Sequence, residues 1–225
     1  MLGTIVIEVS LALYTLWRYQ MDTLTRLAVT SFFGLAIFQV AEFNVCTGSV
    51  MGEAWSKVGF IAITALPPLG IHLMHVLAGN PKRKLVNGCY AVMGGFMAFF
   101  LVYSPTFKSH QCLGNYVIFQ LNDLTSNLYA VYYYALLAIG MSLGIYWAQN
   151  WRKKGQKEIN KRDTVYALVI SYLVFLIPLA VVNTLKPSTT NGIPSIMCGF
   201  AVLYALILGL YIVPNRSVKR QLVKS

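Results

Sequence analysis

Charged residues are scarce in this chain, and those of negative sign are the scarcest. Only 11% of the 225 residues are charged and just seven are Asp or Glu, while 57% of the chain is apolar. This composition excludes an ordinary soluble domain, whose surface needs many more charged side chains. It is typical of an integral membrane protein in a lipid bilayer, and seven spans of about 20 residues each would use most of the chain.

Recognisable catalytic motifs are also missing. The sequence has no GxSxG, no HExxH and no phosphate-binding loop, so standard hydrolase, metalloprotease and nucleotide chemistry are not indicated. The last apolar stretch has no lysine to which a retinal Schiff base could attach. We therefore predict that the protein is not an enzyme, and we expect no cofactor.

The 18 basic residues are distributed unevenly among the gaps between the apolar stretches. Fifteen of them lie in alternate gaps, and only Lys57, Lys108 and Lys186 lie in the others. Cytoplasmic loops retain Lys and Arg, so the pattern predicts that the amino terminus is outside and the carboxyl terminus is cytoplasmic. Because the basic residues are dispersed among short loops, we expect them to face anionic headgroups of a plasma (inner) membrane and not nucleic acid.

The apolar stretches predict an all-α bundle of seven membrane-spanning helices over residues 1–213, followed by a short basic cytoplasmic tail, 214–225. A long outer segment, 106–127, separates the fourth span from the fifth. Pro67-Pro68 and Pro178 lie inside spans and should kink them, because proline cannot donate the helical hydrogen bond. The expected spans are 2–17, 27–45, 55–77, 85–103, 128–151, 164–185 and 193–213.

Two of the four cysteines are placed to form a disulfide. Cys46 and Cys112 both lie in outer connections, where two thiols in an oxidising compartment would pair and tie the long outer segment over the bundle. The alternative is that they are two unpaired small residues. Cys89 and Cys198 lie within spans near opposite faces, and we expect them to serve as packing residues.

Glu8, Glu42 and Lys57 are ionisable residues inside spans or at their edges, where a charge is costly unless it is paired or hydrated. Glu42 and Lys57 lie at comparable depth on consecutive antiparallel helices. A pair between them, with Gln39 and Asn44 nearby, would form the polar floor or rim of an outward-facing cavity. A structural ion pair near the interface is the alternative.

His72 and His75 lie three residues apart, so they share one side of the third span near its inner end. Two histidines are too few for a closed metal site, and an interfacial polar pair is favoured over a pair of metal ligands. An intramembrane metal enzyme built on these histidines is a third hypothesis for the function.

Two short motifs resemble the seven-helix amino-terminal sensor region of bacterial and archaeal histidine kinases. They are Trp55-Ser56-Lys57-Val58-Gly59-Phe60 with Leu66-Pro67-Pro68-Leu69 in the third span, and Ile193-Pro194-Ser195-Ile196 at the start of the seventh. The resemblance implies ligand sensing on the outer side and helix motion passed inward. Those sensors continue into an output domain, whereas only residues 214–225 follow here, so we expect an isolated sensor module or a stand-alone relative.

We therefore expect a receptor-like sensor that binds a small amphiphilic ligand between the outer halves of its helices. It would signal to a separate cytoplasmic protein through the basic loop 152–162 and the tail that starts at Arg216. A small-molecule transporter or carrier is the alternative, with the same intramembrane charges on a substrate path. The predicted ligand-binding residues are Glu8, Gln39, Glu42, Asn44, Lys57, Asp123 and Asn183, with Tyr132 and Tyr133 as a wall.

Overall fold

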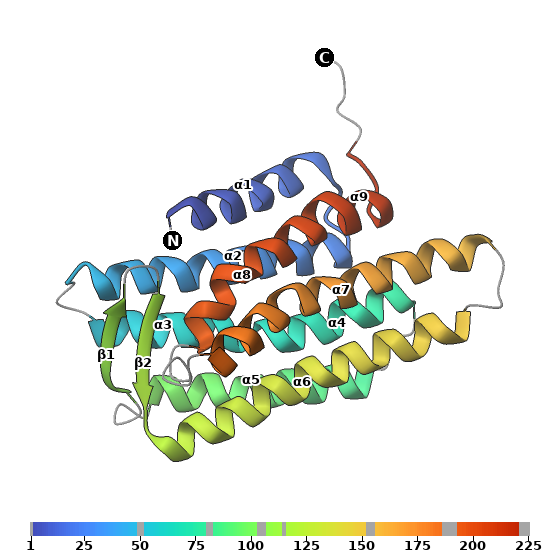
Figure 1. The fold of residues 1–225 in the computed structure, drawn as a ribbon. Helices are drawn as coiled ribbons and strands as arrows, with labels where there is room; N and C mark the ends of the chain where they lie inside the picture. The colour runs from blue at the N-terminus through green and yellow to red at the C-terminus, as the bar shows by residue number, and fades with distance from the viewer. Residues whose placement is uncertain are drawn as a thin grey trace.

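The computed structural model describes residues 2–48, 52–79, 83–102, 107–113, 116–151, 156–185 and 193–220. Most of these residues lie in helices that run side by side along one long axis, and a small β-hairpin lies at one end of the bundle (Figure 1). Residues 49–51, 80–82, 103–106 and the loop 152–155 lie outside the described residues, as do 186–192, which include Lys186, and 221–225 of the tail.

The chain begins with α1 (Leu2–Arg18) and α2 (Thr23–Cys46), which pack against each other. The carboxylate of Asp22 accepts a hydrogen bond from the Thr25 backbone N–H (2.7 Å), and this side-chain cap explains why α2 begins after Asp22. The isolated bridge Tyr19↔Lys219 then joins the connection between α1 and α2 to the carboxyl-terminal segment.

The third rod of the bundle is broken into α3 (Gly52–Thr64) and α4 (Leu66–Ala78). The break falls at Ala65, just before Pro67 and Pro68, which have no N–H groups with which to continue the helix. The Ala65 N–H bonds instead to the Ala62 carbonyl, three residues back (3.3 Å). The sequence predicted a kink at the two prolines. In the structure the helical hydrogen bonding is also interrupted there.

After α5 (Arg83–Val102), the outer segment forms an antiparallel hairpin of β1 (Phe107–Leu113) and β2 (Tyr116–Leu121), which the sequence did not predict. The predicted disulfide is confirmed: Cys46 at the end of α2 is bonded to Cys112 in β1, with their Cα atoms 5.7 Å apart. Strand β2 contacts α2 and α8. The hairpin is thus fastened over one end of the bundle.

The remaining helices are α6 (Asp123–Asn150), α7 (Gln156–Leu185) and α8 (Ile193–Ile207), which continues through the π-helical turn η4 (Leu208–Ile212) into α9 (Val213–Arg216). Pro178 lies inside α7, and Pro214 lies in the first turn of α9. A π-turn is a common place for a helix to change its hydrogen-bond register, and here it directly precedes a proline.

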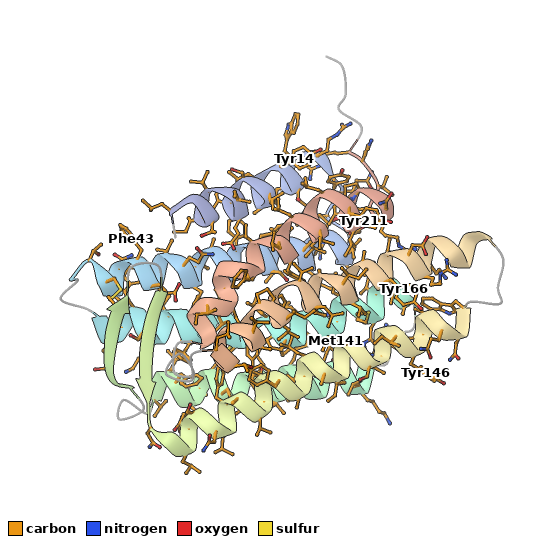
Figure 2. All side chains as sticks on the ribbon, viewed as in Figure 1. Tyr14, Phe43, Met141, Tyr146, Tyr166 and Tyr211 are labelled. Atoms are coloured by element: carbon orange, nitrogen blue, oxygen red, sulfur yellow. A yellow bond between two sulfur atoms is a disulfide. The ribbon has the colours of Figure 1, made fainter. Side chains whose placement is uncertain are left out.

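Five helical segments among the described residues are long and apolar enough to cross a membrane. Large apolar side chains such as Tyr14, Tyr146 and Tyr211 are exposed on the bundle surface (Figure 2). Both features are typical of an integral membrane protein, as predicted. The five segments are Thr23–Cys46, Gly52–Ala78, Arg83–Val102, Leu124–Asn150 and Ile196–Arg216.

Helix α4 lies at the centre of the bundle, in contact with α2, α5, α6 and α7. Gly140 and Gly144 lie one turn apart on α6 and face Ile71 and Met74 of α4, the small-xxx-small arrangement that lets two membrane helices approach closely. On α4 itself, Gly70 lies against the Tyr172 hydroxyl of α7. Small residues therefore allow α4 to be surrounded by neighbours.

A Cβ atom added at Gly70 would overlap the Tyr172 hydroxyl, whereas one added at Gly88 in α5 would meet nothing within 4 Å. We expect Gly70→Ala to lower the free energy of unfolding by about 1–3 kcal/mol, because it overpacks the bundle. The control Gly88→Ala should raise it by up to about 1 kcal/mol, because alanine favours the helix. Unfolding midpoints of the purified variants in one detergent would show this, and equal midpoints would contradict the central packing of α4.

Candidate functional site

Three of the predicted site residues come together in a buried polar network between α1, α2 and α8. Glu8 of α1 and Gln39 and Glu42 of α2 are all buried, with at most 2% of each exposed. The Gln39 side-chain amide donates to a Glu8 carboxylate oxygen (3.1 Å) and to the backbone carbonyl of Cys198 (3.5 Å). The Thr4 hydroxyl in turn donates to the Gln39 side-chain oxygen. The network therefore links three helices at the end of the bundle where α1 begins.

The second carboxylate oxygen of Glu8 has no hydrogen-bond partner among the described residues. Lys57 forms an ion pair with Glu53, one turn earlier in α3, at 3.0 Å. Because the Glu53 side chain is 56% exposed, this pair is of the solvent-accessible kind that contributes little to stability. The predicted pairing of Lys57 with Glu42 stays a prediction.

The other predicted polar residues are not joined to this network by any hydrogen bond among the described residues. Asn44 is half-buried and donates its side-chain amide to the Val40 carbonyl of its own helix (2.8 Å). Asp123 is the first residue of α6 and Asn183 lies in the last turns of α7, but their side chains lie outside the described residues.

Tyr132 belongs to an aromatic cluster in which α3, α5 and α6 meet. Its ring lies 4.5 Å from that of Phe96, measured between centroids. Phe100 lies 5.3 Å from both Phe60 and Tyr129 by the same measure, in tilted and edge-on arrangements that favour aromatic pairs. This aromatic cluster consists of Phe60, Phe96, Phe100, Tyr129 and Tyr132, all buried or half-buried.

Tyr132 also supplies a hydrogen bond that the broken helix lacks. Its hydroxyl donates to the Thr64 backbone carbonyl at 2.7 Å. In a continuous helix that carbonyl would accept from the residue four positions on, but this residue is Pro68, which has no N–H. The Thr64 hydroxyl donates to the Phe60 carbonyl (2.6 Å) and lies 3.2 Å from the Tyr129 hydroxyl. Two tyrosines of α6 are therefore bonded to Thr64 at the α3–α4 break.

A cavity of about 540 Å³ lies between α5 and the first turns of α6, beside the hairpin. We call it the hairpin-side cavity. It is apolar apart from Asn122, which directly follows β2, and Thr125. Its volume falls in the range typical of small-molecule sites. Phe96 lines this cavity and also contacts Tyr132. The lining residues are Val92, Gly95, Phe96, Phe99, Asn122, Leu124, Thr125 and Leu128.

The sequence did not indicate this cavity, because none of its lining residues is charged and hydropathy marks only the charges within the spans. Gly95 in the middle of α5 was the signal that could have found it, since it lines the cavity and a Cβ there would meet nothing within 4 Å. Glycines with open space beside them in a membrane helix leave room for a ligand or a lipid.

Tyr133, the second predicted wall residue, lines a different and much smaller cavity of about 30 Å³. Tyr172, Tyr204 and Cys198 line it as well, and the rings of Tyr172 and Tyr204 are stacked 5.7 Å apart. This space is large enough for one water molecule. Because the Cys198 carbonyl accepts from Gln39, the small cavity adjoins the polar network.

No family model matches the chain, and no curated protein matches it. The resemblance to histidine-kinase sensor regions therefore stays an expectation. Among the residues that the structure describes, no group of three or more His, Cys, Asp or Glu side chains is placed to hold a metal ion.

Replacing Tyr132 by Phe keeps the ring in the aromatic cluster and removes only the donor to the Thr64 carbonyl. We expect Tyr132→Phe to lower the free energy of unfolding by about 1–3 kcal/mol, because a buried carbonyl loses its partner. The matched control is Tyr134→Phe on the same helix, where 36% of the residue is exposed and the change should be small. Thermal unfolding in detergent would compare them, and equal losses would show that the bond does not stabilise the break.

Proposed function

We propose that the protein is a seven-span, receptor-like sensor. It binds a small amphiphilic ligand in the hairpin-side cavity and passes a helix movement through the α3–α4 break to the opposite, basic end of the bundle. A separate cytoplasmic protein receives the signal there. Seven spans follow if α1 and α7 cross the bilayer together with the five segments that have sufficient length and apolar character.

The orientation rests on two different properties of the two ends. The disulfide between Cys46 and Cys112 belongs to one end, and disulfides form on the oxidising side of a membrane. At the opposite end of α2, the Arg220 N–H donates to the Arg18 carbonyl (2.9 Å), and Arg216 donates to the Leu77 carbonyl (3.3 Å). These contacts gather basic residues from distant parts of the chain, as expected of a cytoplasmic face.

One observation carries the receptor hypothesis: a continuous series of contacts runs from the hairpin-side cavity to the broken helix. Phe96 lines the cavity and packs on Tyr132, and Tyr132 bonds to Thr64 at the break. A ligand that moves Phe96 would therefore act on the hydrogen bond from Tyr132, one of two that join Thr64 to α6. A helix that lacks backbone hydrogen bonds at one point can act as a hinge there, because bending at that point breaks fewer hydrogen bonds than bending elsewhere.

The inner half of the broken rod leads to the basic end. Helix α4 ends at Ala78, and the Leu77 carbonyl accepts from the Arg216 side chain of α9. A shift of α4 would therefore move the segment that carries Arg216, Lys219 and Arg220. This basic surface is the one that we assign to the signalling partner.

n-Decanol is a suitable probe for the cavity, because its chain is apolar and its hydroxyl could bond to Asn122 or Thr125. Spin labels on Val218→Cys and Asn150→Cys would report the separation between the segment that carries Arg216 and the end of α6, where both native residues are exposed. In nanodiscs we expect decanol to change this separation by about 1–2 Å, the size of a typical helix shift. Pulsed electron resonance measures this distance directly.

Gly95→Leu should abolish the response to decanol, because it fills the cavity from α5. Gly94→Leu is the matched control, since Gly94 is the neighbouring residue and does not line the cavity. Tyr132→Phe should leave decanol binding intact and weaken the distance change. A response in Gly95→Leu equal to that of the unmodified protein would overturn the proposed site, and binding without any distance change would overturn the signalling role.

The orientation can be tested with the native cysteines. Cys89 and Cys198 are buried, and Cys46 and Cys112 are bonded to each other, so intact protein should not react with a membrane-impermeant maleimide. After reduction of intact cells with an impermeant phosphine, we expect labelling of the unmodified protein and none of a Cys46→Ser, Cys112→Ser double variant. A cysteine introduced at Ser225 should react only in permeabilised cells. The opposite pattern would reverse the proposed orientation.

A further inference from the structure

The polar end of the hairpin-side cavity is formed by Asn122 and Thr125, where α6 begins. The two residues are three positions apart, so their side chains lie on one side of the start of the helix. The other lining residues that the structure describes are apolar or glycine, and none of them is charged. Because a charged head would find no counter-charge here, a ligand of this cavity should have a neutral head that meets these two polar groups.

The Asn122 side chain can offer a ligand only its N–H groups. Its oxygen caps α6 by accepting from the Leu124 backbone N–H (3.0 Å). Since a backbone N–H is a donor, the atom that faces it must be the amide oxygen and not the amide nitrogen. The nitrogen, with its two hydrogens, is therefore the part of this half-buried side chain that remains to bind a ligand.

Thr125 is a buried residue whose hydroxyl has no partner. Only 6% of it is exposed, and its hydroxyl makes no hydrogen bond with any residue that the structure describes. Thr30 and Thr64 donate to the carbonyl four residues earlier in their own helices (2.8 and 2.6 Å), but the residue four positions before Thr125 is Leu121, the last of β2. The Thr125 oxygen is also not among the polar atoms that the fold both occludes and leaves without a partner, so it is accessible in the cavity.

These two groups place two donors and one acceptor, the Thr125 oxygen, at the same end of the cavity. A carbonyl oxygen has two lone pairs and no hydrogen, so it can accept from both donors and leave neither unpaired. An alcohol brings a third donor: if its O–H donates to the Thr125 oxygen, the Thr125 hydrogen has no acceptor. Because an unpaired buried donor is costly, a ketone or an ester suits this end better than an alcohol.

The apolar part of the cavity extends along α5 and borders the lipid. Val92 and Phe99 of α5 both line it, seven residues or about 10 Å apart along the helix. Leu124 and Leu128 line it from α6 and are themselves exposed on the bundle surface (68% and 56%). A ligand with a single alkyl chain can therefore enter from the bilayer and lie against α5 with its head at the start of α6.

We propose that the hairpin-side cavity selects a neutral, single-chain amphiphile whose head is a carbonyl group, such as a long-chain ketone or ester. The Asn122 amide and the Thr125 hydroxyl both donate to the carbonyl oxygen. The ligand class rests on the proposed function, because it concerns the same cavity. Thr125, Tyr129 and Tyr132 follow one another on α6 at spacings of four and three residues, so the head binds on the face of α6 that is bonded to the α3–α4 break.

Three probes of equal chain length test the head group: 2-decanone, n-decanol and decane, each with a fluorinated terminal methyl group. Fluorine NMR of the full chain in nanodiscs would measure bound and free probe, with affinity expressed per mole fraction of probe in the lipid. The Gly95→Leu variant, in which the cavity is filled, gives the background. We expect 2-decanone to bind most tightly and decane least, with about fivefold to tenfold between successive probes, the size of one hydrogen bond.

Variants assign the two donors. Thr125→Val should weaken 2-decanone about fivefold and leave decane unchanged, whereas Thr125→Ser, which keeps the hydroxyl, should retain the preference. Asn122→Ser keeps a residue that can cap α6 but removes the amide, so it should weaken 2-decanone to a similar extent. Ser126→Ala is the matched control, since Ser126 is the next residue and does not line the cavity. Without a probe, Thr125→Val should not lower the unfolding midpoint, because it removes a hydroxyl that has no partner.

The possible failures separate the ligand class from the site. Equal affinities of the three probes, all abolished by Gly95→Leu, would keep the proposed site and overturn its selection of a carbonyl. If no probe binds the unmodified protein more tightly than Gly95→Leu, both the site and the ligand class are overturned. A preference for 2-decanone that persists in Thr125→Val would remove the role of the hydroxyl. A lower unfolding midpoint of Thr125→Val would show that the hydroxyl serves the fold and not a ligand.

Discussion

The requirement that every backbone carbonyl in the hydrocarbon find a donor governs how this bundle is assembled. Pro68 removes the donor that the Thr64 carbonyl would have used, and the Tyr132 hydroxyl replaces it at 2.7 Å. This bond, together with the one between the Thr64 and Tyr129 hydroxyls, joins α6 to the middle of the broken rod. The aromatic cluster lies around the same point, because Tyr129 and Tyr132, which bond to Thr64, also pack against Phe60 and Phe96.

The central position of α4 explains why two large cavities in the described part of the chain border α5. Glycines on α4 and α6 let α2, α6 and α7 pack closely around α4, and Gly70 lies directly against Tyr172. Helix α5 lies at the edge of the bundle and packs less tightly, so space remains on both of its ends. The hairpin-side cavity has only Asn122 and Thr125 as polar lining residues, whereas the cavity between α4 and α5 at the basic end also has His72, Asn87 and Arg83 in its lining.

The disulfide and the proline interruption could be predicted because each depends on a few residues and a local rule. Cys46 and Cys112 were recognisable from their place in outer connections, and Pro67-Pro68 from the missing N–H groups. The β-hairpin could not be predicted in the same way, because strand pairing depends on which segments meet across the outer segment. The ion pair between Lys57 and Glu53 was not foreseen, because hydropathy registers the cost of a charge but not its neighbours, and the pairing of Lys57 with Glu42 stays a prediction.

The sequence by itself determined the membrane character of the protein, the positions of its apolar stretches and the asymmetry of its basic residues. These properties follow from the free energy of transferring each side chain from water to the membrane. The values can be summed over a stretch of sequence without knowledge of the fold. Only the tertiary structure decided that the Gln39 amide donates to Glu8 and that the Tyr132 hydroxyl donates to the Thr64 carbonyl. Hydrogen-bond partners and cavities depend on which faces of distant helices meet, and packing decides this only when the whole bundle has formed.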